Sequence, residues 1–362
     1  MSPPAEVATT ALWRRHWPEY GMEAALLGIF MLSACLFATL LFYPGSPVPA
    51  LIPDPFLRRV IMGIAMGSTA VALNYSAWGK QSGAHYNPAV TLAFTRLGKI
   101  APWDAAAYVG AQFAGAVAGV FAATIIVGSM LAHSEVHYAA TRPGAAGVPA
   151  AFAAEAVISF ILMIVVLTAL DRMNLARFTG LFAGLLVAAF ITIEAPLSGM
   201  SMNPARTVGS AWWAQDWTAL WLYFTAPPLG MLAAAEVFLR LRRSPGFCAK
   251  LHHQNNKRCI FCEYQGRGTT NVSGTRTGVS GTRTGVSGTR TDVSGERRER
   301  EAVRAALSGR NLLRGFSRLA GEIPLGACPE RSRRARNDRL YTPPIHPAYR
   351  SRLSLPRSRR CL

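Results

Sequence analysis

Two stretches of the chain repeat one pattern: SGAHYNPAVTLAF, which starts at Ser82, and SGMSMNPARTVGS, which starts at Ser198. Their shared boxes are Asn87-Pro88-Ala89 and Asn203-Pro204-Ala205. Asn is among the best helix N-caps, and Pro is favoured at the first helical position because its missing N–H is not needed there. Each box therefore predicts the start of a helix, and each helix is too short to cross a membrane.

Long apolar segments without charges surround both boxes. Most of them reach the ~20 residues that a helix needs to cross ~30 Å of hydrocarbon. The segment 178–193 is short unless it extends into its flanking residues. The pattern predicts an all-α, polytopic membrane protein with six spans, which are Ala24–Phe42, Val60–Gly79, Ala105–Ala132, Ala156–Leu170, Phe178–Ile193 and Trp217–Ala235.

The two halves of the chain resemble each other. Glu23 stands at the start of the first span and Glu155 at the start of the fourth, and one Asn-Pro-Ala box follows the second span of each half. Three spans per half place the halves in opposite orientations, as in inverted-repeat transport proteins. The two half-helices would then meet N-terminus to N-terminus at the midplane. Their dipoles would hold water there and repel protons and cations.

Basic residues near the span ends predict the orientation in the membrane. Most of them fall on one side of a six-span arrangement, while Arg58, Arg59 and Arg142 fall on the other. This distribution predicts that both termini are cytoplasmic. The residues on the cytoplasmic side would be Arg14, Arg15, Lys80, Arg96, Lys99, Arg172, Arg177, Arg240, Arg242 and Arg243.

Over residues 20–243 this combination closely resembles the aquaporin / major intrinsic protein family, and bacterial aquaporin-like channels within it. The resemblance implies six transmembrane helices plus two re-entrant half-helices in an inverted repeat, assembled as a homotetramer. It also implies that Asn87 and Asn203 donate hydrogen bonds to permeating molecules. Carbonyls of residues 83–85 and 198–200 would accept hydrogen bonds beside them. Glu23 and Glu155 would anchor the loops, unless they are interfacial carboxylates at span ends.

The resemblance places a selectivity filter at four positions counted from the boxes. These are Gly67, Ile191, Met200 and Arg206. Water-selective members carry an aromatic ring and a His at the first two, so this filter would be wider and less polar. A one-residue bulge would bring Met66 to the pore in place of Gly67. Other positions resemble the water channels, namely Thr207, Ala211, Tyr223 and Phe224.

A group of thiols and imidazoles follows the sixth span. A Cys-x-x-Cys pair with Cys and His a few residues earlier could supply four ligands to Zn²⁺. The alternative is an amphipathic basic juxtamembrane helix whose thiols are incidental. His85, in the first loop, would be a gate or a ring satisfied within that loop, and we favour the second. The candidate ligands are Cys248, His252, His253, Cys259 and Cys262.

The chain carries a net charge of +19 that is concentrated in its last hundred residues. We expect a cytoplasmic segment over 1–20, a channel domain over 21–243, a basic Cys/His segment over 244–265 and a disordered Arg-rich tail over 266–362. That tail starts with seven-residue repeats from Thr270 that resemble translated repetitive DNA, or it is a functional polybasic arm.

The sequence thus predicts a passive channel in the cell membrane for water or small uncharged solutes, which excludes protons and ions. No nucleophile–base pair or phosphate loop points to an enzyme. We expect no cofactor apart from the possible zinc, and no nucleic acid bound to the channel core. The alternative function is a membrane-anchored regulator whose basic tail binds nucleic acid or anionic lipid, with salt-dependent binding.

Overall fold

The computed structural model describes residues 5–242 and 246–263, with the side chains of residues 5–13 left aside. Within these ranges the chain forms helices, turns and loops and no strand. The expected tail over 266–362 lies outside the described residues. The translated-repeat and regulator hypotheses, which depend on that tail, therefore stay predictions.

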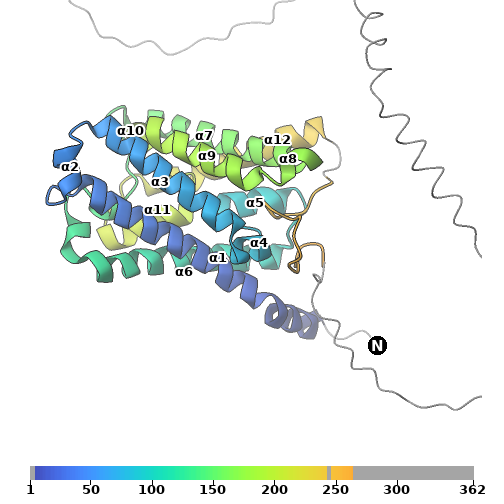
Figure 1. The fold of residues 1–362 in the computed structure, drawn as a ribbon. Coiled ribbons are helices and arrows are strands. Elements are labelled where there is room, and N and C mark those ends of the chain that lie inside the picture. Colours follow the sequence, from blue (N-terminus) through green and yellow to red (C-terminus); the bar gives the residue numbers. More distant parts are fainter. Residues whose placement is uncertain (1–4, 243–245, 264–362) are drawn as a thin grey trace, which may run out of the picture. The chain divides into compact units, whose positions relative to one another are not determined.

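The helices form one bundle in which the two halves of the chain lie side by side (Figure 1). In the first half the elements are α1 (Ala5–Phe42), α2 (Pro47–Leu51), α3 (Pro55–Tyr75), α4 (Ala77–Ser82), α5 (Pro88–Arg96), α6 (Pro102–Val127) and the 3₁₀ turns η1 (Gly128–Ala132) and η2 (His137–Ala139). In the second half they are α7 (Gly147–Leu170), α8 (Met173–Ala176), α9 (Thr179–Ile193), α10 (Ala195–Ser198), α11 (Pro204–Ala214) and α12 (Leu220–Leu241).

Both Asn-Pro-Ala boxes start a short helix, as the capping chemistry predicts. Asn87 is extended, with φ −156° and ψ 117°, and its side chain accepts a hydrogen bond from the backbone N–H of Ala89. Asn203 adopts the same conformation and accepts from Ala205 and Arg206. The half-helices α5 and α11 are therefore confirmed, and each begins inside the bundle.

Five helices of the described chain are long and apolar enough to cross a membrane. They are Arg14–Phe42, Pro55–Tyr75, Pro102–Ala132, Gly147–Leu170 and Leu220–Leu241. The sixth expected span corresponds to α9, which has 15 residues. A helix of that length covers only ~22 Å. The short helices α8 and α10 adjoin α9 at its two ends.

The main helix pairs reflect the inverted repeat. In the first half α1 packs along α6, in the second half α7 packs along α12, and α3 and α9 pair across the two halves. Glycines allow the closest approaches: a Cβ at Gly119 of α6 would lie 2.2 Å from the carbonyl oxygen of Gly28 on α1. A Cβ at Gly184 would lie 2.8 Å from the carbonyl oxygen of Gly67. Small residues therefore form the surfaces on which these helices pack.

Two of the expected domain boundaries do not separate structural units. The helix α1 runs from Ala5 to Phe42, so nothing divides the chain at residue 20. Residues 246–263, which we call the C-terminal cap, form turns and contain no helix in their described length. The alternative of an amphipathic juxtamembrane helix is therefore wrong for these residues. The cap belongs to the same compact unit as the bundle, Met1–Gly274.

We predict that Gly119→Ala destabilises the bundle, because its new methyl group would meet the backbone of α1. Overpacking of this kind costs roughly 1–3 kcal/mol, so the thermal unfolding midpoint of the purified protein should fall. Gly110→Ala is the matched control on the same helix, since a Cβ there meets nothing within 4 Å. Equal midpoints for the two variants would contradict the close α1–α6 contact.

Candidate functional site

The two half-helices meet through their capping asparagines. The amide Nδ2 of Asn87 donates to the carbonyl oxygen of Met202 at 2.8 Å, and that of Asn203 donates to the carbonyl oxygen of Tyr86 at 2.8 Å. Each asparagine thus caps its own helix with its oxygen and binds the opposite loop with its nitrogen. An amide nitrogen has two hydrogens, so one donor on each asparagine remains for another partner.

A buried carboxylate holds the first loop. Glu23 of α1 is fully buried. Its Oε1 accepts from the Ser82 hydroxyl at 2.7 Å and from the backbone N–H of His85 at 3.1 Å. Its Oε2 accepts from the backbone N–H of Tyr86 at 2.5 Å and from the side chain of Gln112 at 2.9 Å. Four donors therefore satisfy one carboxylate, which excludes the interfacial position for Glu23.

The second loop repeats this arrangement around Glu155 of α7, which is also fully buried. Its Oε1 accepts from the Ser198 hydroxyl and from the backbone N–H of Ser201, both at 2.6 Å. Its Oε2 accepts from the backbone N–H of Met202 at 2.7 Å. The same two backbone donors per loop are bound in both halves, so the sites are related by the inverted repeat.

Both loops hold non-glycine residues in the left-handed region. Ala84 and Tyr86 have φ values of 58° and 29°, and Met200 and Met202 have 52° and 51°. Conformations of this kind cost of order 1–3 kcal/mol each and persist only where the surroundings enforce them. The hydrogen bonds to the two buried glutamates supply that enforcement. In each loop, one residue outside the left-handed region, His85 or Ser201, separates two residues inside it.

A cavity of about 430 Å³ runs between the loops. Its wall includes both asparagines, residues 84–86 of the first loop and residues 199–202 of the second. Arg59, near the start of α3, lies at one end of the wall, and Leu251 of the cap belongs to it near the first loop. The rest of the wall is mostly apolar, with Glu135 and Arg206 as further charged residues.

Two of the carbonyls that the resemblance assigns to the cavity are bound elsewhere. The carbonyl oxygen of Gly83 accepts from the backbone N–H of Leu251 at 3.1 Å. That of Ser198 accepts from the Tyr223 hydroxyl at 2.5 Å. Neither Gly83 nor Ser198 lines the cavity, whereas their neighbours in each loop do. The carbonyl acceptors available to a solute are therefore fewer than the resemblance implies.

Gly67 does not line the cavity, contrary to the position obtained by counting from Asn87. It faces α9, where a Cβ would lie 2.6 Å from the carbonyl oxygen of Gly184. Met66 lines the cavity instead, with Met62 and Ala70 one turn away on either side. A count along the sequence does not show which side of α3 faces α9 and which side faces the cavity.

The other three filter positions lie on the cavity wall: Ile191, Met200 and Arg206. Within the described part of the chain, the buried Nη1 of Arg206 has no hydrogen-bond partner. A buried donor without a partner is costly, so this nitrogen is suited to a polar molecule in the cavity. These positions of the cavity wall, with Met66 in place of Gly67, combine one cation with three apolar side chains.

The four residues that resemble those of the water channels make mainly structural contacts. Thr207 binds Ser201 at 2.6 Å and Thr141 at 3.0 Å, and so connects the second loop to the segment before α7. Ala211 and Tyr223 are buried, while the ring of Phe224 is 43% exposed and stacks on Phe113. None of these four lines the cavity.

His85 lines the cavity, but both of its ring nitrogens are engaged. Nδ1 lies 3.2 Å from the Thr91 hydroxyl, and Nε2 lies 2.9 Å from the carbonyl oxygen of Ala249 in the cap. A carbonyl only accepts, so Nε2 must carry the proton. The ring also stacks between Phe94 and Phe261. His85 is thus satisfied partly by its own loop and partly by the cap.

The structure brings together four of the five candidate metal ligands. The ligand atoms of Cys248, His253, Cys259 and Cys262 all lie within 4.8 Å of one another. His252 lies apart, with its ring edge-on to Tyr75 at 5.3 Å between centroids. Three of these four ligands, Cys248, His253 and Cys262, also line a second cavity beside the cluster.

Sequence reasoning missed the ion pair between Glu19 and Arg258. Glu19 is fully buried, and Arg258 of the cap donates to both of its oxygens, at 2.7 and 2.5 Å. The hydrogen bond to Glu19 raises the pKa of Arg258 above its usual value. The two residues are 239 positions apart. No local signal marks such a pair, although a glutamate at the edge of a long apolar helix was visible in the sequence.

Comparison with known proteins gives a family match over most of the bundle. The family model described as "Major intrinsic protein" matches residues 24–238. Aquaporin NIP1-3 of Oryza sativa subsp. japonica is 37% identical over 181 residues, which cover 49% of this chain and 61% of that protein. Aquaporin NIP6-1 of Arabidopsis thaliana is 38% identical over 181 residues, which cover 48% and 55%. The chain thus spans under two thirds of these curated relatives.

A solved structure has the same fold. The aquaglyceroporin from Plasmodium falciparum superposes with a TM-score of 0.51 at 20% sequence identity. The superposition covers 62% of this chain and 95% of that one. At this identity the likeness concerns the fold alone.

We predict that Glu155→Gln destabilises the second loop. Both carboxylate oxygens accept from backbone N–H groups, so either orientation of the new amide sets its NH₂ against one of these donors. An unsatisfied buried donor costs roughly 1–3 kcal/mol, and the unfolding midpoint should fall accordingly. Ser159→Ala is the control on the same helix, because the buried Ser159 hydroxyl has no partner among the described residues. A midpoint for Glu155→Gln as high as that of Ser159→Ala would refute the anchoring role.

Proposed function

The chain belongs to the major intrinsic protein family, and from this premise we propose that it is a passive transmembrane channel. Its permeants would be water and small uncharged solutes, and it would exclude protons and ions. The observation that carries the proposal is the cavity of about 430 Å³ at whose centre two capped half-helices meet. The activity is conduction and not catalysis.

The exclusion of ions follows from electrostatics. Both half-helices direct their N-termini, which carry partial positive charge, at the same region of the cavity. Arg206 adds a full positive charge beside them. Each asparagine retains one donor for a passing molecule. Cations and protons are therefore repelled where a neutral hydrogen-bonding molecule is stabilised.

The placement in the cell is part of the proposal. The apolar helices support a multi-pass membrane protein. Lys80, Arg15 and Arg258 lie together at one end of the bundle, where the cap contacts α1 and α4. Because basic residues favour the cytoplasmic side, we assign that end to the cytoplasm of a cell-membrane protein. A homotetramer is proposed from the family resemblance.

The function is tested in proteoliposomes that contain the full chain. We expect faster water flux than in protein-free vesicles and flux of at least one neutral solute, such as glycerol or urea, with no proton or ion current. Arg206→Val should raise proton or cation leakage, because a charge beside the cavity centre is removed. Arg177→Val is the control, since Arg177 is exposed and away from the cavity. Vesicles that pass neither water nor any solute would contradict the proposal.

The filter assignment gives a separate prediction. Met66→Ala removes an apolar side chain from the cavity wall, so solute flux should rise several-fold while water flux changes less, because the solute has the larger cross-section. The same substitution at Met130, which lies off the cavity in η1, serves as the control. Unchanged solute flux in Met66→Ala would place the narrowest point elsewhere.

A further inference from the structure

The C-terminal cap lies directly on the first re-entrant loop. Besides the bond from Leu251 to Gly83 and the contact of Ala249 with His85, the ring of Phe261 stacks on His85 at 5.8 Å. A Cβ at Gly83 would lie 2.9 Å from the carbonyl oxygen of Ala249. The cap is thus fitted to the loop at van der Waals distance, and Leu251, only 5% exposed, forms part of the cavity wall.

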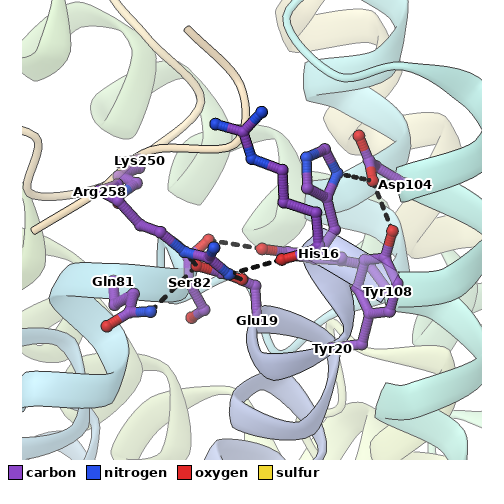
Figure 2. A network of polar contacts seen from close by, with 10 residues as sticks. His16, Glu19, Tyr20, Gln81, Ser82, Asp104, Tyr108, Lys250 and Arg258 are labelled. Carbon is purple, nitrogen blue, oxygen red and sulfur yellow. Dashed lines mark hydrogen bonds and ion pairs between the residues drawn. The ribbon is translucent and has the colours of Figure 1, made fainter. Parts of the chain in front are cut away.

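Polar contacts fix the cap to the surrounding helices. Arg258 donates to both oxygens of Glu19, as Figure 2 shows. It also donates to the carbonyl oxygen of Arg15 on α1. Lys250 is almost fully buried and donates to the carbonyl oxygens of Arg258 at 2.6 Å and Lys80 at 3.3 Å. The cap therefore has one defined position on the bundle.

A comparison of the two loops shows that the cap lies where the inverted repeat would place a segment like the one between α6 and α7. At the second loop, a Cβ at the equivalent glycine, Gly199, would lie 2.9 Å from backbone atoms of Thr141 and Arg142 in the segment between α6 and α7. At the first loop, Gly83 packs against Ala249 and the side chain of Lys250. The cap thus covers the first loop as the inter-repeat segment covers the second, and the cap supplies a leucine to the cavity wall.

The conformation of the cap requires a stabilising interaction within the cap. It has no helix or strand in its described length, and a segment this short lacks a core of its own. Three thiols and one imidazole lie at its centre. Cys248 Sγ is 3.4 Å from Cys259 Sγ, and His253 Nε2 is 3.2 Å from Cys262 Sγ. A tetrahedral zinc site with Zn–S of about 2.3 Å separates its ligand atoms by roughly 3.5–3.8 Å.

A Cys₃His set of this size is suited to zinc. Thiolate and imidazole ligands in a closed four-coordinate site are typical of structural Zn²⁺. The site joins both ends of the cap, since Cys248 stands near its start and Cys259 and Cys262 near its finish. All four cysteines in the described ranges are free thiols, which suits the reducing cytoplasm assigned to this end.

We propose that Cys248, His253, Cys259 and Cys262 bind one Zn²⁺ ion, which holds the cap over the cytoplasmic mouth of the cavity so that Leu251 restricts passage. Binding deprotonates the thiols and releases their protons to solvent. All four ligands of the proposed metal site belong to the cap, so the site does not depend on the channel function. The restriction of passage rests on the proposed channel function.

Metal binding is tested on the full chain purified with reductant and supplied with zinc. We expect about one zinc per chain by elemental analysis, and thiolate-to-metal absorption bands when Co²⁺ replaces it. Cys259→Ser combined with Cys262→Ser should lose both signals. His252→Gln should keep them, because His252 lies outside the cluster. Wild-type protein without zinc, or a double variant that retains it, would overturn the site.

The restriction of passage is tested by flux in the same vesicles. Leu251→Ala keeps all four ligands and should raise water and solute flux several-fold with zinc content unchanged. The double cysteine variant should raise flux through loss of the ion. Unchanged flux in both variants, with normal zinc content in the wild type and in Leu251→Ala, would leave a purely structural metal and overturn the restriction. If neither wild type nor variants conduct, the restriction fails together with the proposed function, while the zinc measurement still decides the metal site.

Discussion

The two buried carboxylates, Glu23 and Glu155, are the interaction on which the rest of the site depends. A re-entrant loop carries backbone N–H groups into a region without water, where each unsatisfied donor is costly. Each glutamate accepts from two consecutive N–H groups of its loop and from the serine that precedes them. Because these donors are bound on the outer side, the asparagines can turn inward. The two carboxylates therefore stabilise the loops that hold the half-helices opposite each other.

Close helix packing makes that arrangement possible. The glutamates stand on α1 and α7, and the glycines of α6 and α12 bring these helices to backbone contact: Gly119 lies against Gly28, and Gly230 against Ala156. Bulkier residues would move each carboxylate away from its loop. These glycines thus affect the cavity indirectly, because they set the distance between the helix that carries the carboxylate and the helices around it.

The inverted symmetry ends at the two mouths of the cavity. The second loop is covered by the segment between the repeats, whereas the first is covered by the cap, whose sequence lies after the last helix. An added segment can therefore change one mouth without disturbing the shared centre. A metal-stabilised cover at that position would make the two sides of the channel chemically different, although the two halves that form its centre are alike.

The half-helices, the apolar spans and the paired glutamates could be predicted from the sequence alone, because N-caps and hydrophobic length are local properties. That Met66 and not Gly67 faces the cavity became clear only in the folded bundle, because α9 packs against the side of α3 that carries Gly67. The tertiary structure also decided which of two adjacent histidines joins the cysteines, because the cap has no regular periodicity to read. The contact of Arg258 with Glu19 joins distant parts of the chain. Contacts of that kind depend on where whole helices are placed, which no local pattern encodes.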